Sequence, residues 1–235
     1  MIQTRLIYKS DTVAIAYHIC LDQRRSKVAF AFSGFGNRLL FGEGLGRDFL
    51  IENGFDVISF ISTRDDWFQG LPQSIFPLLD KLCVDHGYRR RVAMGSSMGG
   101  YAAICFSRLL RCDVVLAYSP QYNIADGSDQ RFGPSINIID WKYPIDPDSI
   151  SDICRYKLVY DDKDIDRRHA ERIRSLIKHE NFESVIFRHT GHATIVFLSE
   201  IQMLKHVSLC LLNGARPDLK EIRSRRNRSL TYLIA

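Results

Sequence analysis

The sequence predicts an α/β protein whose central sheet is mostly parallel and covered by helices on both faces. Runs rich in β-branched and aromatic residues alternate with helix-length segments along most of the 235 residues. The run 27–33 (KVAFAFS) is almost wholly apolar, which is typical of a strand buried on both faces. The segments between consecutive later strands are long enough for right-handed crossover connections, which join parallel strands.

The first two strands are expected to form an antiparallel hairpin at the N-terminal edge of the sheet. Residues 3–8 and 12–19 are both β-rich, and Lys9-Ser10-Asp11 between them is a turn signal. This connection is too short for the crossover that parallel strands need. Further strands are expected at 27–33, 57–61, 91–94, 113–118, 156–160 and 184–188, and helices at 44–53, 73–86, 98–111, 167–180 and 193–213.

The chain is expected to be a single domain, 1–235, with one insertion and a basic end. Residues 120–155 break the strand–helix alternation and combine Asp, Ser, Pro and Gly with several aromatic residues. A segment of this length between two sheet strands is typical of a small cap or lid, although a packed surface excursion is the alternative. The stretch 215–235 is expected to be a basic C-terminal tail, either solvated or docked through its apolar last residues.

The net charge of +5 does not indicate a nucleic-acid-binding protein. Residues 214–235 carry six basic and two acidic side chains, which accounts for four of the five net positive charges. No apolar run approaches the ~18 residues of a membrane span, and the N-terminus lacks the profile of a signal peptide. Six scattered cysteines without a C-x-x-C pair suit free thiols in a reducing cytoplasm. A homodimer remains possible.

The segment with the clearest chemical signature is Gly95-Ser96-Ser97-Met98-Gly99, which fits the pattern G-x-S-x-G. A β-rich run directly precedes it and a helical pattern directly follows. Small residues on both sides of Ser97 allow a sharp turn that exposes its hydroxyl at the end of the strand, where the helix N-terminus favours negative charge. The motif therefore predicts Ser97 as a catalytic nucleophile, and a tight turn without chemistry is the alternative.

On these residues the sequence resembles the α/β-hydrolase superfamily over roughly residues 12–213. The resemblance implies the α/β-hydrolase fold, with a nucleophile, an acid and a histidine in that chain order. It implies that His192, in the pair Gly191-His192 after strand 184–188, is the catalytic base. His189 is expected to be a structural neighbour.

The resemblance also places an acid on the loop that leaves strand 156–160, commonly three residues after a glycine. Asp161 stands at that glycine position, which makes Asp164 the implied acid and leaves Asp161 as the alternative. Asp166 is expected to cap the next helix.

In this superfamily, backbone N–H groups form an oxyanion hole that stabilises the negative charge of the reaction intermediate. One of these groups follows the nucleophile, and the resemblance implies that a second comes from the loop after the third strand. Ser33-Gly34-Phe35 stands where relatives often have His-Gly-x, so the backbone N–H groups of Phe35 and Met98 are the expected donors. This chemistry requires neither a metal nor an organic cofactor.

Together these residues predict a serine hydrolase of the carboxylesterase type. It would cleave an ester of a small or carbohydrate-linked acyl group through an acyl-enzyme on Ser97. Trp67 and Trp141 are expected to offer an aromatic substrate-binding surface, with packing against their own loops as the alternative. A thioesterase or acyltransferase on the same fold and a non-catalytic binding or assembly protein remain open, because a fold does not determine its function.

Overall fold

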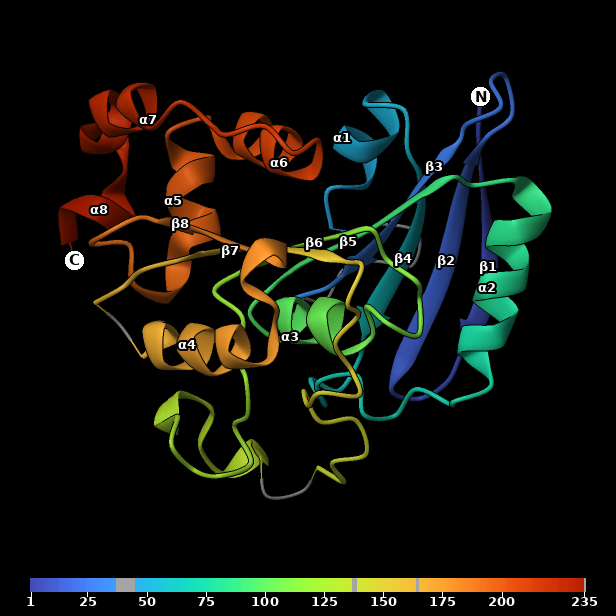
Figure 1. Cartoon of the computed structure of the whole chain (residues 1–235), viewed down its shortest axis with the longest axis horizontal. Coiled ribbons are helices and arrows are strands. Elements are labelled where there is room, and N and C mark those ends of the chain that lie inside the picture. Colours follow the sequence, from blue (N-terminus) through green and yellow to red (C-terminus); the bar gives the residue numbers. More distant parts are fainter. Residues whose placement is uncertain (37–44, 137–138, 164, 235) are drawn as a thin grey trace.

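The predicted α/β architecture is confirmed in the computed structural model, which describes all residues except 37–44, 137–138, 164 and 235 (Figure 1). Eight strands form one sheet in the order β1-β2-β4-β3-β5-β6-β7-β8. Strand β2 pairs antiparallel with both β1 and β4, and the other neighbouring strands pair parallel. The hairpin predicted at the N-terminal edge is therefore present. The strands are β1 (Ile2–Lys9), β2 (Val13–Cys20), β3 (Lys27–Phe32), β4 (Asp56–Ser62), β5 (Arg90–Ser96), β6 (Val114–Tyr118), β7 (Arg155–Tyr160) and β8 (Phe182–Ile186).

Helices cover both faces of this sheet. Along β3, Val28, Phe30 and Phe32 pack into one core cluster, whereas Ala29 and Ala31 pack into another, because successive side chains of a strand point to opposite faces. Helices α2, α3 and α4 contribute to the first cluster, and α1, α5, α6 and α7 contribute to the second (Figure 1). The α-helices are α1 (Arg47–Glu52), α2 (Ile75–His86), α3 (Met98–Cys105), α4 (Asp166–Leu176), α5 (Thr194–Glu200), α6 (Leu204–Leu212), α7 (Leu219–Arg225) and α8 (Leu230–Ile234).

The single long helix predicted over 193–213 is wrong. Helix α5 ends at Glu200. Two residues later Gln202 has a φ of 59°, in the left-handed region, and the Met203 N–H donates to Leu198 O over 2.8 Å. This is a helix-ending arrangement in which glycine is the usual residue. Because glutamine occupies the position, the sequence carries no stop signal, and α6 starts in a new direction.

The C-terminal stretch is folded rather than a solvated tail. Asp218 caps α7 by accepting the N–H groups of Lys220 and Glu221, and Ile222 is buried. The Ser229 hydroxyl then donates to the Glu200 carboxylate, which connects this end of the chain to α5.

Within the part of the chain that the structure describes, no individual helix has the length and apolarity needed to cross a membrane. One consecutive pair, Gly191–Glu200 and Leu204–Leu212, meets these criteria jointly but is bent by 107° at its break.

The carboxyl ends of β3, β5, β6, β7 and β8 meet at one edge of the sheet, and two glycines determine how closely the chain packs there. A Cβ on Gly95 would lie 2.1 Å from Gly99 O, and one on Gly99 would lie 2.5 Å from Phe32 O. Neither position has room for a side chain. Helix α3 can therefore start directly beside the ends of β3 and β5.

We expect Gly95→Ala to lower the free energy of unfolding by about 1–3 kcal/mol, the usual cost of overpacking an interior. Gly34→Ala is the matched control, because its Cβ would lie 3.4 Å from Ser96 O and should change stability by less than ~1 kcal/mol. Urea unfolding followed by tryptophan fluorescence measures both variants. Equal losses would contradict the role given to close packing at Gly95.

Candidate active site

Ser97 lies in a strained turn between β5 and α3. Its backbone has φ 54° and ψ −118°, a conformation that residues with a Cβ rarely adopt. The Ser97 N–H donates to Tyr118 O at the end of β6 over 2.8 Å, which holds the turn against the neighbouring strand. The side chain is partly exposed at the carboxyl edge of the sheet.

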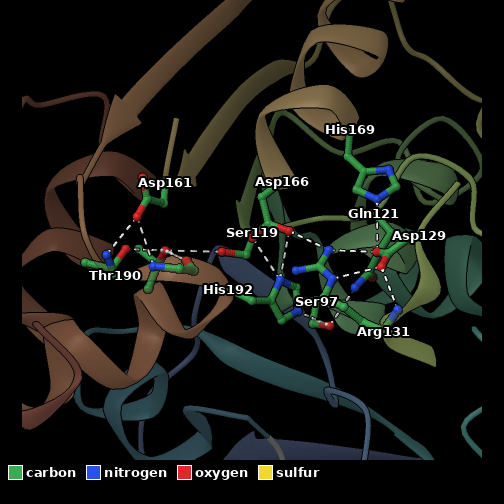
Figure 2. Close-up of polar contacts among 12 residues, drawn as sticks. Ser97, Ser119, Gln121, Asp129, Arg131, Asp161, Asp166, His169, Thr190 and His192 are labelled. Atoms are coloured by element: carbon green, nitrogen blue, oxygen red, sulfur yellow. Dashed lines mark hydrogen bonds and ion pairs between the residues drawn. The ribbon is translucent and has the colours of Figure 1, made fainter. Parts of the chain in front are cut away.

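The structure brings His192 to Ser97 across 95 residues of sequence. Nε2 of His192 lies 2.8 Å from Ser97 Oγ (Figure 2). His192 belongs to a short 3₁₀ turn, Gly191–Ala193, between β8 and α5, and 28% of its side chain is exposed. The two residues selected from the sequence as nucleophile and base are therefore in direct contact.

The carboxylate that contacts His192 is that of Asp166. Nδ1 of His192 lies 2.9 and 2.8 Å from the two Asp166 oxygens, and the Asp166 side chain has no exposed surface (Figure 2). Asp164, which the sequence favoured, lies outside the described residues; among the described residues, the carboxylate in contact with His192 is that of Asp166. Asp166 is the first residue of α4. Asp166 lies two residues farther along the chain than Asp164, the position that the glycine-based spacing favours.

Asp161, the alternative acid, binds backbone instead of imidazole. Its Oδ2 accepts the N–H groups of Thr190 and Gly191 over 2.8 and 2.9 Å, while its Oδ1 accepts the Lys163 N–H. These bonds fix the loop that carries His192. Asp161 therefore supports the position of the imidazole without contacting it.

The contacts of Asp166 keep it ionised. Burial alone would raise its pKa, but the hydrogen bond from His192 and the nearby Arg131 charge hold the pKa below its ordinary value. An ionised Asp166 accepts a hydrogen bond from the Nδ1–H group of His192, which leaves Nε2 as an acceptor for the Ser97 hydroxyl. The arrangement can therefore withdraw a proton from Ser97.

A polar network from the 120–155 segment surrounds this carboxylate and was not found from the sequence. Arg131 donates to Asp166 Oδ1 over 2.8 Å and to both oxygens of Asp129 (Figure 2). His169 of α4 lies 3.1 Å from Asp129 and accepts the Tyr122 N–H. The inserted segment thus contacts the catalytic candidates directly through Arg131.

Gln121 is a second residue that the sequence did not indicate. It follows β6, has no exposed surface, and donates from Nε2 to Ser97 Oγ over 2.8 Å. The Nε1–H of Trp67 points to the other end of the same amide, 3.3 Å from Gln121 Oε1.

The two tryptophans expected to bind substrate differ in exposure. Trp67 is fully buried, enclosed by the rings of Phe35, Phe132 and Trp141, so it offers no surface to a ligand in this conformation. Trp141 is partly exposed and also packs against Tyr101. Phe35, which is 41% exposed, is the most exposed of these aromatic residues.

The loop expected to provide an oxyanion donor lies beside the serine turn. The potential Cβ of Gly34 is 3.4 Å from Ser96 O, and Gly36 N–H donates to Asp65 Oδ1 over 3.0 Å. Met98 is the first residue of α3, where a backbone N–H has no acceptor within the helix. The loop and the helix start therefore flank Ser97, as an oxyanion hole would require.

Three hollows of about 500 Å³ lie in the described part of the surface, and none of their linings includes Ser97 or His192. One is lined by Phe35, Asp65, Asp66, Gln69 and Lys142, among others, and adjoins the expected oxyanion loop. A second is lined by Arg188, Arg223 and Arg226 near the C-terminal helices, and a third by Lys163, Arg167 and Glu171 at and before α4. The first hollow adjoins the candidate site through Phe35, an expected oxyanion donor.

Acid should weaken the network around Asp129. Burial alone would raise the pKa of Asp129, but Arg131 and His169 lower it to about 2. The stabilisation that ionised Asp129 gives the folded state is complete above its pKa in the unfolded state, ~3.9. It is lost as pH falls through its lower pKa in the folded state. We expect the difference in unfolding free energy between the wild type and Asp129→Asn to shrink as pH falls from 4 to 2. Urea unfolding at several pH values measures it, and a constant difference would contradict the assignment.

Neither protein-family models nor curated proteins gave a match to this chain, whereas solved structures gave many. An esterase domain from a Rhodothermus marinus protein has a TM-score of 0.59 at 15% identity, covering 91% of this chain and 97% of that one. A Pyrococcus furiosus esterase has a TM-score of 0.59 at 18% identity, and the match covers 91% of this chain and 92% of the esterase. The capsule O-acetyltransferase of Neisseria meningitidis serogroup A has a TM-score of 0.60 at 13% identity, covering 88% and 93%.

At these identities the similarity establishes architecture rather than activity. The mostly parallel sheet with its antiparallel edge hairpin belongs to a fold that the esterases among these structural neighbours also have. The chain has the α/β-hydrolase fold.

Proposed function

We propose that this protein is a serine esterase that forms an acyl-enzyme on Ser97. The observation that carries the proposal is the continuous hydrogen-bonded series from Ser97 Oγ through His192 to the buried Asp166, with each contact between 2.8 and 2.9 Å. Nucleophile, base and orienting carboxylate are the parts that acyl transfer requires, and they lie within reach of one another without rearrangement.

In the proposed reaction His192 Nε2 takes the Ser97 proton as Oγ attacks the ester carbonyl. Asp166 holds the imidazole in the required tautomer and stabilises the imidazolium that forms. The imidazolium then protonates the leaving alcohol, and the acyl group stays on Ser97. Water, deprotonated by the same imidazole, releases the acid and restores the hydroxyl.

The proposed oxyanion hole consists of the backbone N–H groups of Met98 and Phe35. The start of α3 supports the first donor, because this N–H lies at the positive end of the helix dipole, next to the nucleophile. The close approach of the 33–36 loop to Ser96 supports the second. Each such donor lowers the barrier by roughly 3–4 kcal/mol in a water-excluded site.

The surroundings favour a small or carbohydrate-linked acyl group as substrate. The buried amide of Gln121 fills the space next to Ser97 Oγ, which leaves little room for a long acyl chain on that side. The hollow beside Phe35 combines an aromatic ring with carboxylate, amide and ammonium groups, a lining suited to the hydroxyls of a sugar. We propose that the 120–155 segment acts as a cap over this site.

Acyl transfer to an acceptor alcohol is the second candidate function. The similarity to a capsule O-acetyltransferase over 88% of the chain favours it. The same acyl-enzyme would then react with a sugar hydroxyl instead of water. Incubation with p-nitrophenyl acetate and a neutral oligosaccharide distinguishes the two: acetylated oligosaccharide in the mass spectrum indicates transfer, and free acetate alone indicates hydrolysis.

We expect Ser97→Ala to abolish p-nitrophenyl acetate turnover, because the change removes the oxygen that lies 2.8 Å from His192 Nε2. The adjacent Ser96→Ala is the matched control and should retain activity. Steady-state release of p-nitrophenol measures both. Turnover that survives in Ser97→Ala would reject Ser97 as the nucleophile, and a wild type without turnover would favour a non-catalytic protein.

We expect Asp166→Asn to lower kcat by about 10³–10⁴-fold, as neutralising a triad acid does when it favours the wrong imidazole tautomer. Asp164→Asn, in the same loop, is the control and should remain within a few-fold of the wild type. The reverse pattern would return the role of the acid to Asp164.

A further inference from the structure

The amide of Gln121 has an orientation that its neighbours determine. An indole N–H only donates hydrogen bonds, so the group that faces Trp67 Nε1 must be the Gln121 oxygen. The NH₂ group then faces Ser97 Oγ at 2.8 Å. Because Gln121 has no exposed surface, water does not compete for either end of the amide.

This orientation determines where the serine proton points. A serine hydroxyl has one proton and accepts through its lone pairs. Since Ser97 Oγ accepts from Gln121, its own proton is free to point at His192 Nε2, 2.8 Å away. The same donor interacts more strongly as negative charge develops on Oγ, because hydrogen bonds to charged atoms are the stronger ones.

Backbone strain occurs at Trp67 and two residues before Gln121. Trp67 has a φ of 51° and Phe68 a φ of 60°, values that bulky residues rarely adopt, and Asp66 fixes the turn by accepting the Phe68 and Gly70 N–H groups. On the other side, Ser119 has a φ of 42° two residues before Gln121. Such strain is concentrated at functional sites.

We propose that Gln121, oriented by Trp67, is a positioning residue that directs the Ser97 proton to His192 and stabilises the nucleophilic oxygen. This inference deepens the proposed function and rests on it. It also assigns a role to the buried Trp67, which the sequence had suggested as a substrate contact.

Gln121→Met tests the donor at nearly constant side-chain volume. We expect kcat for p-nitrophenyl acetate to fall by roughly 10- to 100-fold, the value of a hydrogen bond to a charged group, with KM little changed. Trp67→Phe should give a smaller loss. The double variant should be no worse than Gln121→Met alone, because both changes act on one interaction. Wild-type kcat in Gln121→Met, with folding verified by circular dichroism, would overturn the proposal.

Gln121→Glu provides a readout that a purely structural role would not affect. An ionised carboxylate only accepts, so it would draw the Ser97 proton away from His192, whereas a protonated carboxyl group restores a donor. The kcat of this variant relative to the wild type should therefore rise as pH falls, while the ratio for Gln121→Met stays constant. A ratio that is independent of pH for Gln121→Glu contradicts the proposal.

Crystal structures of the wild type and Gln121→Met separate this inference from the proposed function. The wild type should show one Ser97 rotamer with Oγ in contact with His192, and the variant should show a second rotamer or a broken contact. An identical single rotamer in both rejects the role of Gln121, whether or not the protein cleaves esters. If the rotamers differ as expected but the wild type has no turnover, only the proposed function fails.

Discussion

The site depends on one backbone constraint, the left-handed conformation of Ser97 between a strand and a helix. With φ at 54°, the serine presents its hydroxyl at the sheet edge instead of continuing either element. The conformation persists because its surroundings leave no alternative: Gly95 and Gly99 pack against backbone with no room for a Cβ, and Tyr118 O accepts the Ser97 N–H. A strained turn is thus held by close packing, and the same turn starts the helix that would stabilise an oxyanion.

Three separate loops then converge on that hydroxyl. The loop after β8 brings His192, and Asp161 fixes this loop through the backbone of Thr190 and Gly191. The start of α4 brings Asp166, and the 120–155 segment adds Arg131 to the same carboxylate. Because Arg131 also pairs with the buried Asp129, the inserted segment and the acid form one charged network. The position of this segment and the ionisation of the acid are therefore coupled.

The sequence predicted the parts of the molecule that have local signals. Alternating strand and helix patterns predicted the sheet and both helical layers, and the motif around Ser97 predicted a residue that does contact His192. Asp166 was assigned to a cap, because which carboxylate of the loop after β7 reaches His192 depends on how that loop folds and not on a pattern within it. Gln121 and Arg131 belong to a segment without periodicity, and their contacts with the site arise only from tertiary packing. The sequence did not predict the break at Gln202, because a left-handed backbone conformation at a residue other than glycine has no sequence signature.

The central claim is that the Ser97 oxygen is made nucleophilic by His192 and is accessible to an acyl group. The most direct measurement is peptide mapping by mass spectrometry after reaction with a fluorophosphonate, which modifies activated serines. The account predicts a single adduct, on the peptide that contains Ser97, and no adduct when His192 is replaced by alanine. An unmodified Ser97 in the wild type, or an adduct only on another residue, would contradict it.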